Sequence, residues 1–346
     1  MIDFDKPNKS VSVWLLVVML LVMAIIVVGG GTRLTNSGLS ITEWAPIRGS
    51  LPPLSHEAWL AEFEKYKLIP EFEAEHPDMD LAGFKAIYFW EWAHRQLGRI
   101  IGLAYLLPFI YFTVRRKLPK RNFRPFLLPL VLIGLQGAIG WWMVHSGLQE
   151  GMVDVSHYRL ATHLGMAFII LGVLYWLRKS HNNGFRPTKI HAEYKKRTAL
   201  LGVMVFIQII AGAFVAGTKS GRSYNEWPLM DGDFIPAGYG AMSPLWLNAF
   251  ENTAAIQFNH RFLAYILFGF ALWVCFSMRK SQYMRSISVM LLGILFWQVG
   301  LGIMTLLSGD NFDPAHIKLA LLHQFSAVFV FIVALAMAWK SRHFVR

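Results

Sequence analysis

Long apolar segments alternate with polar loops along this chain, and eight of these segments are long enough to cross a membrane as helices. A membrane-spanning helix needs roughly 20 consecutive, mostly apolar residues. The even-numbered segments carry a polar patch near their first turns, whereas the odd-numbered segments are more uniformly apolar. The pattern predicts an all-α integral membrane protein with spans at residues 11–30, 86–114, 125–145, 157–177, 198–217, 255–277, 286–307 and 317–339.

Composition and charge agree with this class of protein. Of the 346 residues, 55% are hydrophobic and 16% are charged, whereas soluble domains carry about 25% charged residues. The net charge of +12 would suit a nucleic-acid partner. However, Lys and Arg concentrate in alternate loops, above all 115–124 and 178–197. This positive-inside asymmetry places both termini in the cytoplasm and accounts for the basic charge without nucleic acid.

The two halves of the chain repeat the same features in the same order. The loops at 30–53 and 216–236 both run from Gly-Thr and a basic residue to Glu-Trp and Pro. The third and seventh spans share a Gln-x-x-x-Gly pattern that begins at Gln136 and Gln298. A fixed repeat of this kind indicates two copies of one structural unit.

The repeat predicts two four-helix bundles, residues 1–190 and 191–346. Because four spans separate equivalent positions, both bundles should have the same orientation, related by a pseudo-twofold axis along the membrane normal. The longest loop contains the segment 55–69, in which apolar residues recur at helical spacing between charges. This segment should form an amphipathic helix at the surface or the membrane interface.

Four of the 12 histidines lie within the spans, one in each even-numbered span: His94, His163, His260 and His323. Each lies a few turns from the start of its span, so all four should form one layer in the outer half of the membrane. A single buried histidine often bonds only a neighbouring helix, but four at matched positions indicate function. Two histidines on facing helices suit axial ligation of haem iron, whereas a bare metal ion needs three or four ligands. We expect two haem sites, His94 with His163 and His260 with His323.

The residues beside the first histidine of each pair are similar but not identical. Arg95 and Arg261 follow these histidines, and they can pair with haem propionates, bond helix ends or face another helix. Glu91, three residues before His94, corresponds to Gln257 in the second half. A carboxyl group handles protons or stabilises positive charge, which an amide does not. Glu91 therefore suggests a reactive first site, although it could also cap the helix or pair with Arg95.

The other histidines carry weaker signals. His145, His157 and His316 lie at the ends of spans, where they could contact a cofactor or the interface. Solvation is expected for the remaining five, which are His56, His76, His181, His191 and His343.

Segments along nearly the whole chain resemble the haem A synthase family. They are GGTRLTNSGLSITEW, EWAHRQLGR, SHYRLATHLG, ENTAAIQFNHRFLAY, WQVGLGIMTLL and the histidine of the last span. The chain is most similar to the proteobacterial and mitochondrial branch. Another branch has a cysteine pair in an outer loop, but the single cysteine here, Cys275, lies inside a span. No disulfide chemistry is therefore carried over.

The resemblance implies O₂-dependent oxidation of the C8 methyl group of haem O, through a hydroxylated intermediate, to the formyl group of haem A for cytochrome oxidase. It implies that His94 and His163 flank the substrate or product haem and that Glu91 assists proton handling. It further implies that His260 and His323 ligate a haem b that relays electrons. Because a six-coordinate haem has no open position for O₂, we expect one first-half histidine to be displaceable.

The resemblance also implies a place in the bacterial inner membrane, with the haem layer towards the periplasm. Haem O synthase and oxidase assembly factors are expected partners, membrane lipid surrounds the protein, and a homo-oligomer is compatible with the sequence. Two other functions fit the residues alone: a quinol-linked dihaem electron carrier of the cytochrome b type, and a haem transporter. The sequence leaves the electron donor and the role of Arg99 open.

Overall fold

The computed structural model describes residues 7–45, 48–118, 123–183, 192–309 and 314–343. Eight helices within these ranges are long and apolar enough to cross a membrane, which confirms the predicted all-α membrane class. They are α1 (Lys9–Leu34), α4 (Leu81–Val114), α5 (Leu127–Gly147), α6 (His157–Asn183), α7 (Ala192–Gly217), α9 (Thr253–Ser277), α10 (Gln282–Leu307) and α11 (Pro314–Lys340).

Polar caps explain why several helices begin before their apolar runs. The side chain of Asn8 accepts hydrogen bonds from two backbone N–H groups at the start of α1. Asn252 does the same for α9, and Asp80 accepts from one such group, the Gly83 N–H, at the start of α4. Such caps satisfy N–H groups that have no partner within the helix. The first turns of α4 therefore extend ahead of the expected span at residues 86–114.

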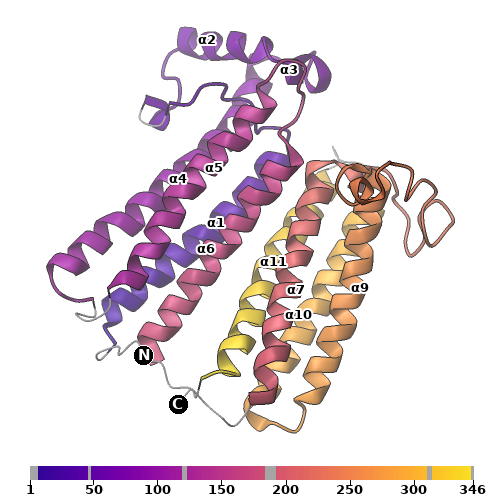
Figure 1. The fold of residues 1–346 in the computed structure, drawn as a ribbon. Coiled ribbons are helices and arrows are strands. Elements are labelled where there is room, and N and C mark those ends of the chain that lie inside the picture. Colours follow the sequence, from indigo (N-terminus) through magenta and orange to yellow (C-terminus); the bar gives the residue numbers. More distant parts are fainter. Residues whose placement is uncertain (1–6, 46–47, 119–122, 184–191, 310–313, 344–346) are drawn as a thin grey trace.

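The eight long helices form two four-helix bundles that lie side by side (Figure 1). In the first bundle, α1 packs against α4 and α6, and α5 packs against α4 and α6. In the second bundle, α7 packs against α9 and α11, and α10 packs against α9 and α11. Each helix of the first bundle thus has a counterpart with equivalent neighbours in the second.

The helix pairs at the interface between the bundles are also equivalent when the two halves are exchanged. Helix α6 packs against α7, α1 packs against α11, and α6 also packs against α11. Exchanging every helix for its counterpart returns these same three pairs, as a twofold relation requires. The direction of the axis stays a prediction, and the expected boundary between the halves lies outside the described residues, within 184–191.

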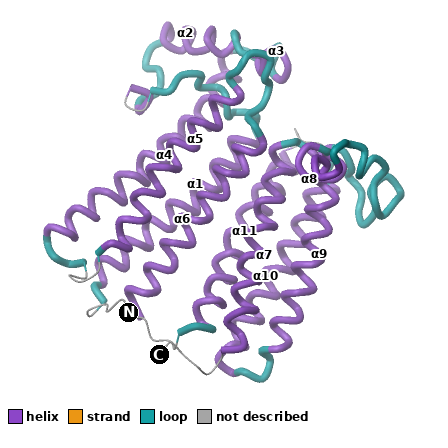
Figure 2. Tube along the Cα trace, in the orientation of Figure 1, coloured by secondary structure: helices purple, strands orange, loops and turns teal. Residues whose placement is uncertain are grey.

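The connections at one end of the bundles are longer and hold two further helices, α2 (His56–Lys67) and α3 (Pro70–Glu75). Figure 2 shows the longer loops gathered at this end, which we call the cap end, while α1 begins and α11 ends at the opposite end. Trp59, Phe63 and Tyr66 of α2 are buried against the start of α4. The amphipathic helix predicted over 55–69 is confirmed, and α4 covers its apolar face.

A buried carboxyl group lies between α2 and α3. Glu71 is 4% exposed, and the hydroxyl of Tyr66 donates to its Oε2 at 3.1 Å. Loss of solvation raises the pKa of Glu71 to about 8, above its ordinary value of 4.5. The folded cap therefore holds a proton at pH values where the unfolded chain has released it.

Glu71 should make the cap less stable as the pH rises. The contribution of Glu71 to the free energy of unfolding is complete below pH 4.5. It is lost as the pH rises towards about 8, because only the unfolded state ionises freely in that window. We expect a loss on the order of 1 kcal/mol per pH unit. Thermal unfolding at several pH values measures this slope. Glu71→Gln should flatten it and the exposed Glu73→Gln should not; equal slopes for wild type and Glu71→Gln would refute the assignment.

Candidate functional site

The structure brings the four intramembrane histidines together as two pairs. His94 on α4 faces His163 on α6, with ring centroids 6.3 Å apart and ring planes at 79°. A bond between a metal ion and an imidazole nitrogen is about 2.0 Å long, so two rings on opposite sides of one metal ion have centroids roughly 6 Å apart. His260 on α9 and His323 on α11 are close enough to interact electrostatically. The first pair therefore fits one iron between two rings, although ligation itself stays a prediction.

A glycine on the neighbouring helix lies against each of these rings. A Cβ atom added to any of the four glycines would lie 2.9–3.1 Å from a ring atom: Gly29 faces His94, Gly140 faces His163, Gly212 faces His260 and Gly302 faces His323. All four distances are shorter than those of nearly all real Cβ contacts, so a larger residue would force the ring or the helix to shift. The glycines thus let each histidine ring lie directly against a helix backbone.

A glutamine one turn before the glycine contacts three of the four histidines. Each amide nitrogen donates to the backbone carbonyl of its histidine at 3.0 Å and lies 3.1–3.5 Å from a ring nitrogen: Gln136 contacts His163, Gln208 contacts His260 and Gln298 contacts His323. A metal-bound imidazole is oriented by an acceptor at its second ring nitrogen, and the oxygen of the same amide is the group that can serve. We call this arrangement the Gln-Gly clamp.

The clamps also contain buried polar atoms that have no hydrogen-bond partner among the described residues, as expected beside a site for a cofactor. Among the described residues, Nδ1 of His163 and Oε1 of Gln136 are buried without a hydrogen bond, as is Oε1 of Gln208. An imidazole that binds iron through one nitrogen presents N–H at the other, and such an amide oxygen can accept it. The donor set therefore fits haem.

The sequence pattern predicted the match of Gln136 with Gln298, but not the role of Gln208 or the contact of the four glycines with the rings. A signal for them was present. Helix α10 contains QVGLG and α5 contains QGAIG, and a similar segment, QIIAG, occurs at residues 208–212 in α7. What the pattern alone lacked was the information that each such helix packs against a histidine helix.

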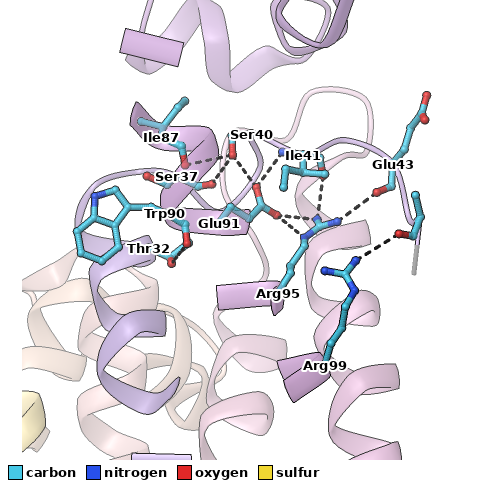
Figure 3. A network of polar contacts seen from close by, with 11 residues as sticks. Thr32, Ser37, Ser40, Ile41, Glu43, Ile87, Trp90, Glu91, Arg95 and Arg99 are labelled. Atoms are coloured by element: carbon cyan, nitrogen blue, oxygen red, sulfur yellow. Dashed lines mark hydrogen bonds and ion pairs between the residues drawn. The ribbon is translucent and has the colours of Figure 1, made fainter. Parts of the chain in front are cut away.

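Glu91 lies in a polar network where α4 meets the loop after α1 (Figure 3). Its side chain is 2% exposed. It accepts hydrogen bonds at 2.8 Å from the Ser40 hydroxyl and the Ile41 N–H group, and at 2.6 and 3.0 Å from Arg95. Four hydrogen bonds therefore hold this buried carboxyl group in place. The pairing of Glu91 with Arg95, one of the alternatives that the sequence left open, is therefore present.

The two arginines hold the loops in the same way in both halves. Arg95 and Arg261 each donate to the backbone carbonyl of the glutamate in the repeated Glu-Trp pair, and to the backbone carbonyl two residues before it. The four bonds are 2.8–3.1 Å long: Arg95 to Ile41 and Glu43, and Arg261 to Tyr224 and Glu226. Arg99 adds a bond of 3.3 Å to the Ala45 carbonyl. Arg95 and Arg261 thus bond the histidine helix of each half to its loop. A role with haem propionates stays a prediction.

The buried carboxyl group of Glu91 has a neutral amide as its counterpart in the second half. Gln257, the counterpart of Glu91, donates to the Tyr224 carbonyl at 3.0 Å. Its Oε1 and the Nε of Arg261 are buried without a hydrogen bond among the described residues. Within the described residues, the asymmetry seen in the sequence therefore corresponds to an ion pair beside His94 and none beside His260.

Most of the remaining histidines contact neighbouring residues. His145 contacts Gln149, His157 lies 3.6 Å from Glu251, and His316 contacts Ser308. The expected solvation of His181 and His343 is wrong, because both are buried. His181 bonds the backbone of Asn8, and the ring of His343 stacks on Trp339. His76 bonds Tyr66, His56 is exposed, and His191 lies outside the described residues.

The fold and the paired histidines define a multi-pass membrane protein with a candidate cofactor site in each of two helical bundles. The chain belongs to the cytochrome oxidase assembly protein family, whose sequence profile matches residues 12–335. This confirms the family resemblance found in the sequence, because its similar relatives carry the name Heme A synthase.

Three such relatives come from bacteria. The protein of Maricaulis maris is 46% identical over 97% of both chains. That of Paracoccus denitrificans is 46% identical over 97% of this chain and 88% of its own. That of Caulobacter vibrioides is 43% identical over 97% of both chains.

Replacing a ring-facing glycine should weaken haem binding. In Gly140→Ala, the added Cβ would lie 2.9 Å from the His163 ring and push it out of position. We expect about a tenfold loss of haem affinity in the first half, measured as haem absorbance per protein during titration. Gly137→Ala on the same helix is the matched control, because its Cβ would meet nothing within 4 Å. Equal haem content in the two variants would show that the ring contact does not matter.

Proposed function

We propose that this chain is a haem A synthase that oxidises the C8 methyl group of haem O to the formyl group of haem A in an O₂-dependent reaction. The observation that carries the proposal is the facing pair His94 and His163, in a chain 46% identical over 97% of its length to a protein named Heme A synthase. The relatives supply the reaction, and the histidine pair supplies a place for the haem substrate.

The two halves take different roles in this proposal. Residues 1–190 hold the substrate haem between His94 and His163. Residues 191–346 hold a haem b between His260 and His323. When bound, haem b supplies electrons and the first-half iron supplies the oxidising chemistry. The chain itself orients both groups, through the glycines and glutamines that position the rings.

Glu91 acts beside the first site as a fixed negative charge. Its four hydrogen bonds occupy both carboxylate oxygens, so one donor must leave before it can accept a proton. We therefore assign it first to positioning Arg95 and the loop near His94, and to stabilising positive charge that develops there. Proton handling by Glu91 follows only after Ser40 or Arg95 moves.

The orientation follows from the loop charges. Lys and Arg concentrate at the end where α1 begins and α11 ends. This distribution supports the proposal that both termini lie in the cytoplasm of a bacterial inner membrane, with the cap end and the haem layer towards the periplasm. Haem O synthase would deliver the substrate, and oxidase assembly factors would receive the product.

Pigment analysis of the purified protein, made in cells that supply haem O, tests the function. Haem A or a hydroxylated haem O, found together with haem B, supports synthesis. A dihaem electron carrier, which the equivalent histidine pairs favour as the second candidate, would contain haem B alone. A haem transporter would exchange haem O without any need for oxygen.

Glu91→Gln should lower haem A output at least tenfold, because it removes the charge that holds Arg95 and makes the first half resemble the second. Extracted pigments measure the output, and the haem B content shows whether the second half remains intact. Glu64→Gln is the matched control, because Glu64 is exposed on α2 and, among the described residues, pairs with Lys67 alone. Wild-type output from Glu91→Gln would remove Glu91 from the proposed reaction.

A further inference from the structure

His94 is the one paired histidine that lacks a Gln-Gly clamp. Gly29 lies against its ring, as the other three glycines lie against theirs. Four residues before Gly29, however, the chain has Ile25, where the three clamps have glutamine. Among the described residues, no hydrogen bond involves a ring nitrogen of His94.

Ile25 occupies the position from which a glutamine would reach the histidine helix. A Cβ added to Gly98, one turn after His94 on α4, would lie 3.7 Å from Cδ1 of Ile25. The isoleucine side chain therefore points at α4 beside the histidine. Helix α7, the counterpart of α1, carries Gln208 at this place, and its amide reaches both the carbonyl and the ring of His260. The first half thus keeps the glycine and replaces the amide with an apolar group.

The difference has a direct effect on how firmly each ring is held. A hydrogen bond that the second ring nitrogen donates to an acceptor, such as an amide oxygen, orients a ligating imidazole and strengthens it as a ligand, and its loss typically weakens metal binding 10–100-fold. His163, His260 and His323 each have such an amide beside the ring. His94 has only packing, so its ring is held least firmly.

We propose that His94 is the displaceable ligand of the first-half haem, and that Ile25 is the positioning residue that leaves it free to depart. In this step the bond between iron and an imidazole nitrogen breaks, the electron pair stays on the nitrogen, and no oxidant or reductant is consumed. His163 remains bound and keeps the haem in place. The purpose of the open position, access for O₂, rests on the proposed haem A synthase function, whereas the weaker hold on His94 does not.

Carbon monoxide binding to the reduced protein tests the proposal, because carbon monoxide needs a vacant position on ferrous haem. We expect wild type to bind it at one of its two haems. Ile25→Gln adds the missing amide and should slow binding about tenfold, while Ile25→Leu, which keeps the site apolar, should leave the rate within twofold. If Ile25→Gln binds carbon monoxide as fast as wild type, His94 is not the ligand that leaves.

A reciprocal variant gives a second test that does not depend on correct folding of Ile25→Gln. Gln208→Ile removes the clamp from His260 and should let carbon monoxide bind the second haem, which wild type protects. An unchanged second haem would show that the clamp does not control ligand release, and the proposal would fail. Pigments from the same samples separate the two hypotheses: absence of haem A refutes the function alone, and normal haem A with unchanged carbon monoxide kinetics refutes the inference alone.

Discussion

The architecture depends on how imidazole rings are accommodated inside apolar helices. A polar ring in the membrane needs partners from neighbouring helices, because no water is available there. Here the partners are a glycine, which lets the ring lie against a helix backbone, and in three cases a glutamine, which contacts the ring and the carbonyl of the histidine. Small residues and buried amides are what close helix packing in membranes requires. The helix pairs within each bundle are therefore also the units that hold the rings.

Departures from the repeat carry most of the functional information. The arginine ties between helix and loop are the same in both halves, so they serve the shared scaffold. Two positions near His94 differ: Glu91 replaces a neutral amide with a charge, and Ile25 replaces an amide with an apolar side chain. One change adds a charge near the ring, and the other removes a constraint on it. Both distinguish the same ring, which is consistent with one half doing chemistry and the other transferring electrons.

Much of the fold could be predicted because its signals are local. Runs of apolar residues identified all eight spans, and periodic apolar residues identified α2. The histidine pairs followed from the repeat, since equivalent helices place equivalent residues at equivalent depths. Errors arose where burial depends on distant contacts. His181 and His343 occur among polar residues near helix ends, yet α1 covers one and Trp339 stacks on the other.

The sequence by itself determined the membrane class, the number of spans, the two pairs of histidines and the asymmetry between Glu91 and Gln257, because composition and repeat spacing express these directly. Only the tertiary structure decided what those residues contact. It placed the carboxylate of Glu91 in an ion pair with Arg95, directed both arginines to loop carbonyls, and set Gln208 beside His260 where α1 has Ile25 beside α4. These contacts join helices that are far apart in the chain, and their geometry depends on helix packing, which no local pattern records.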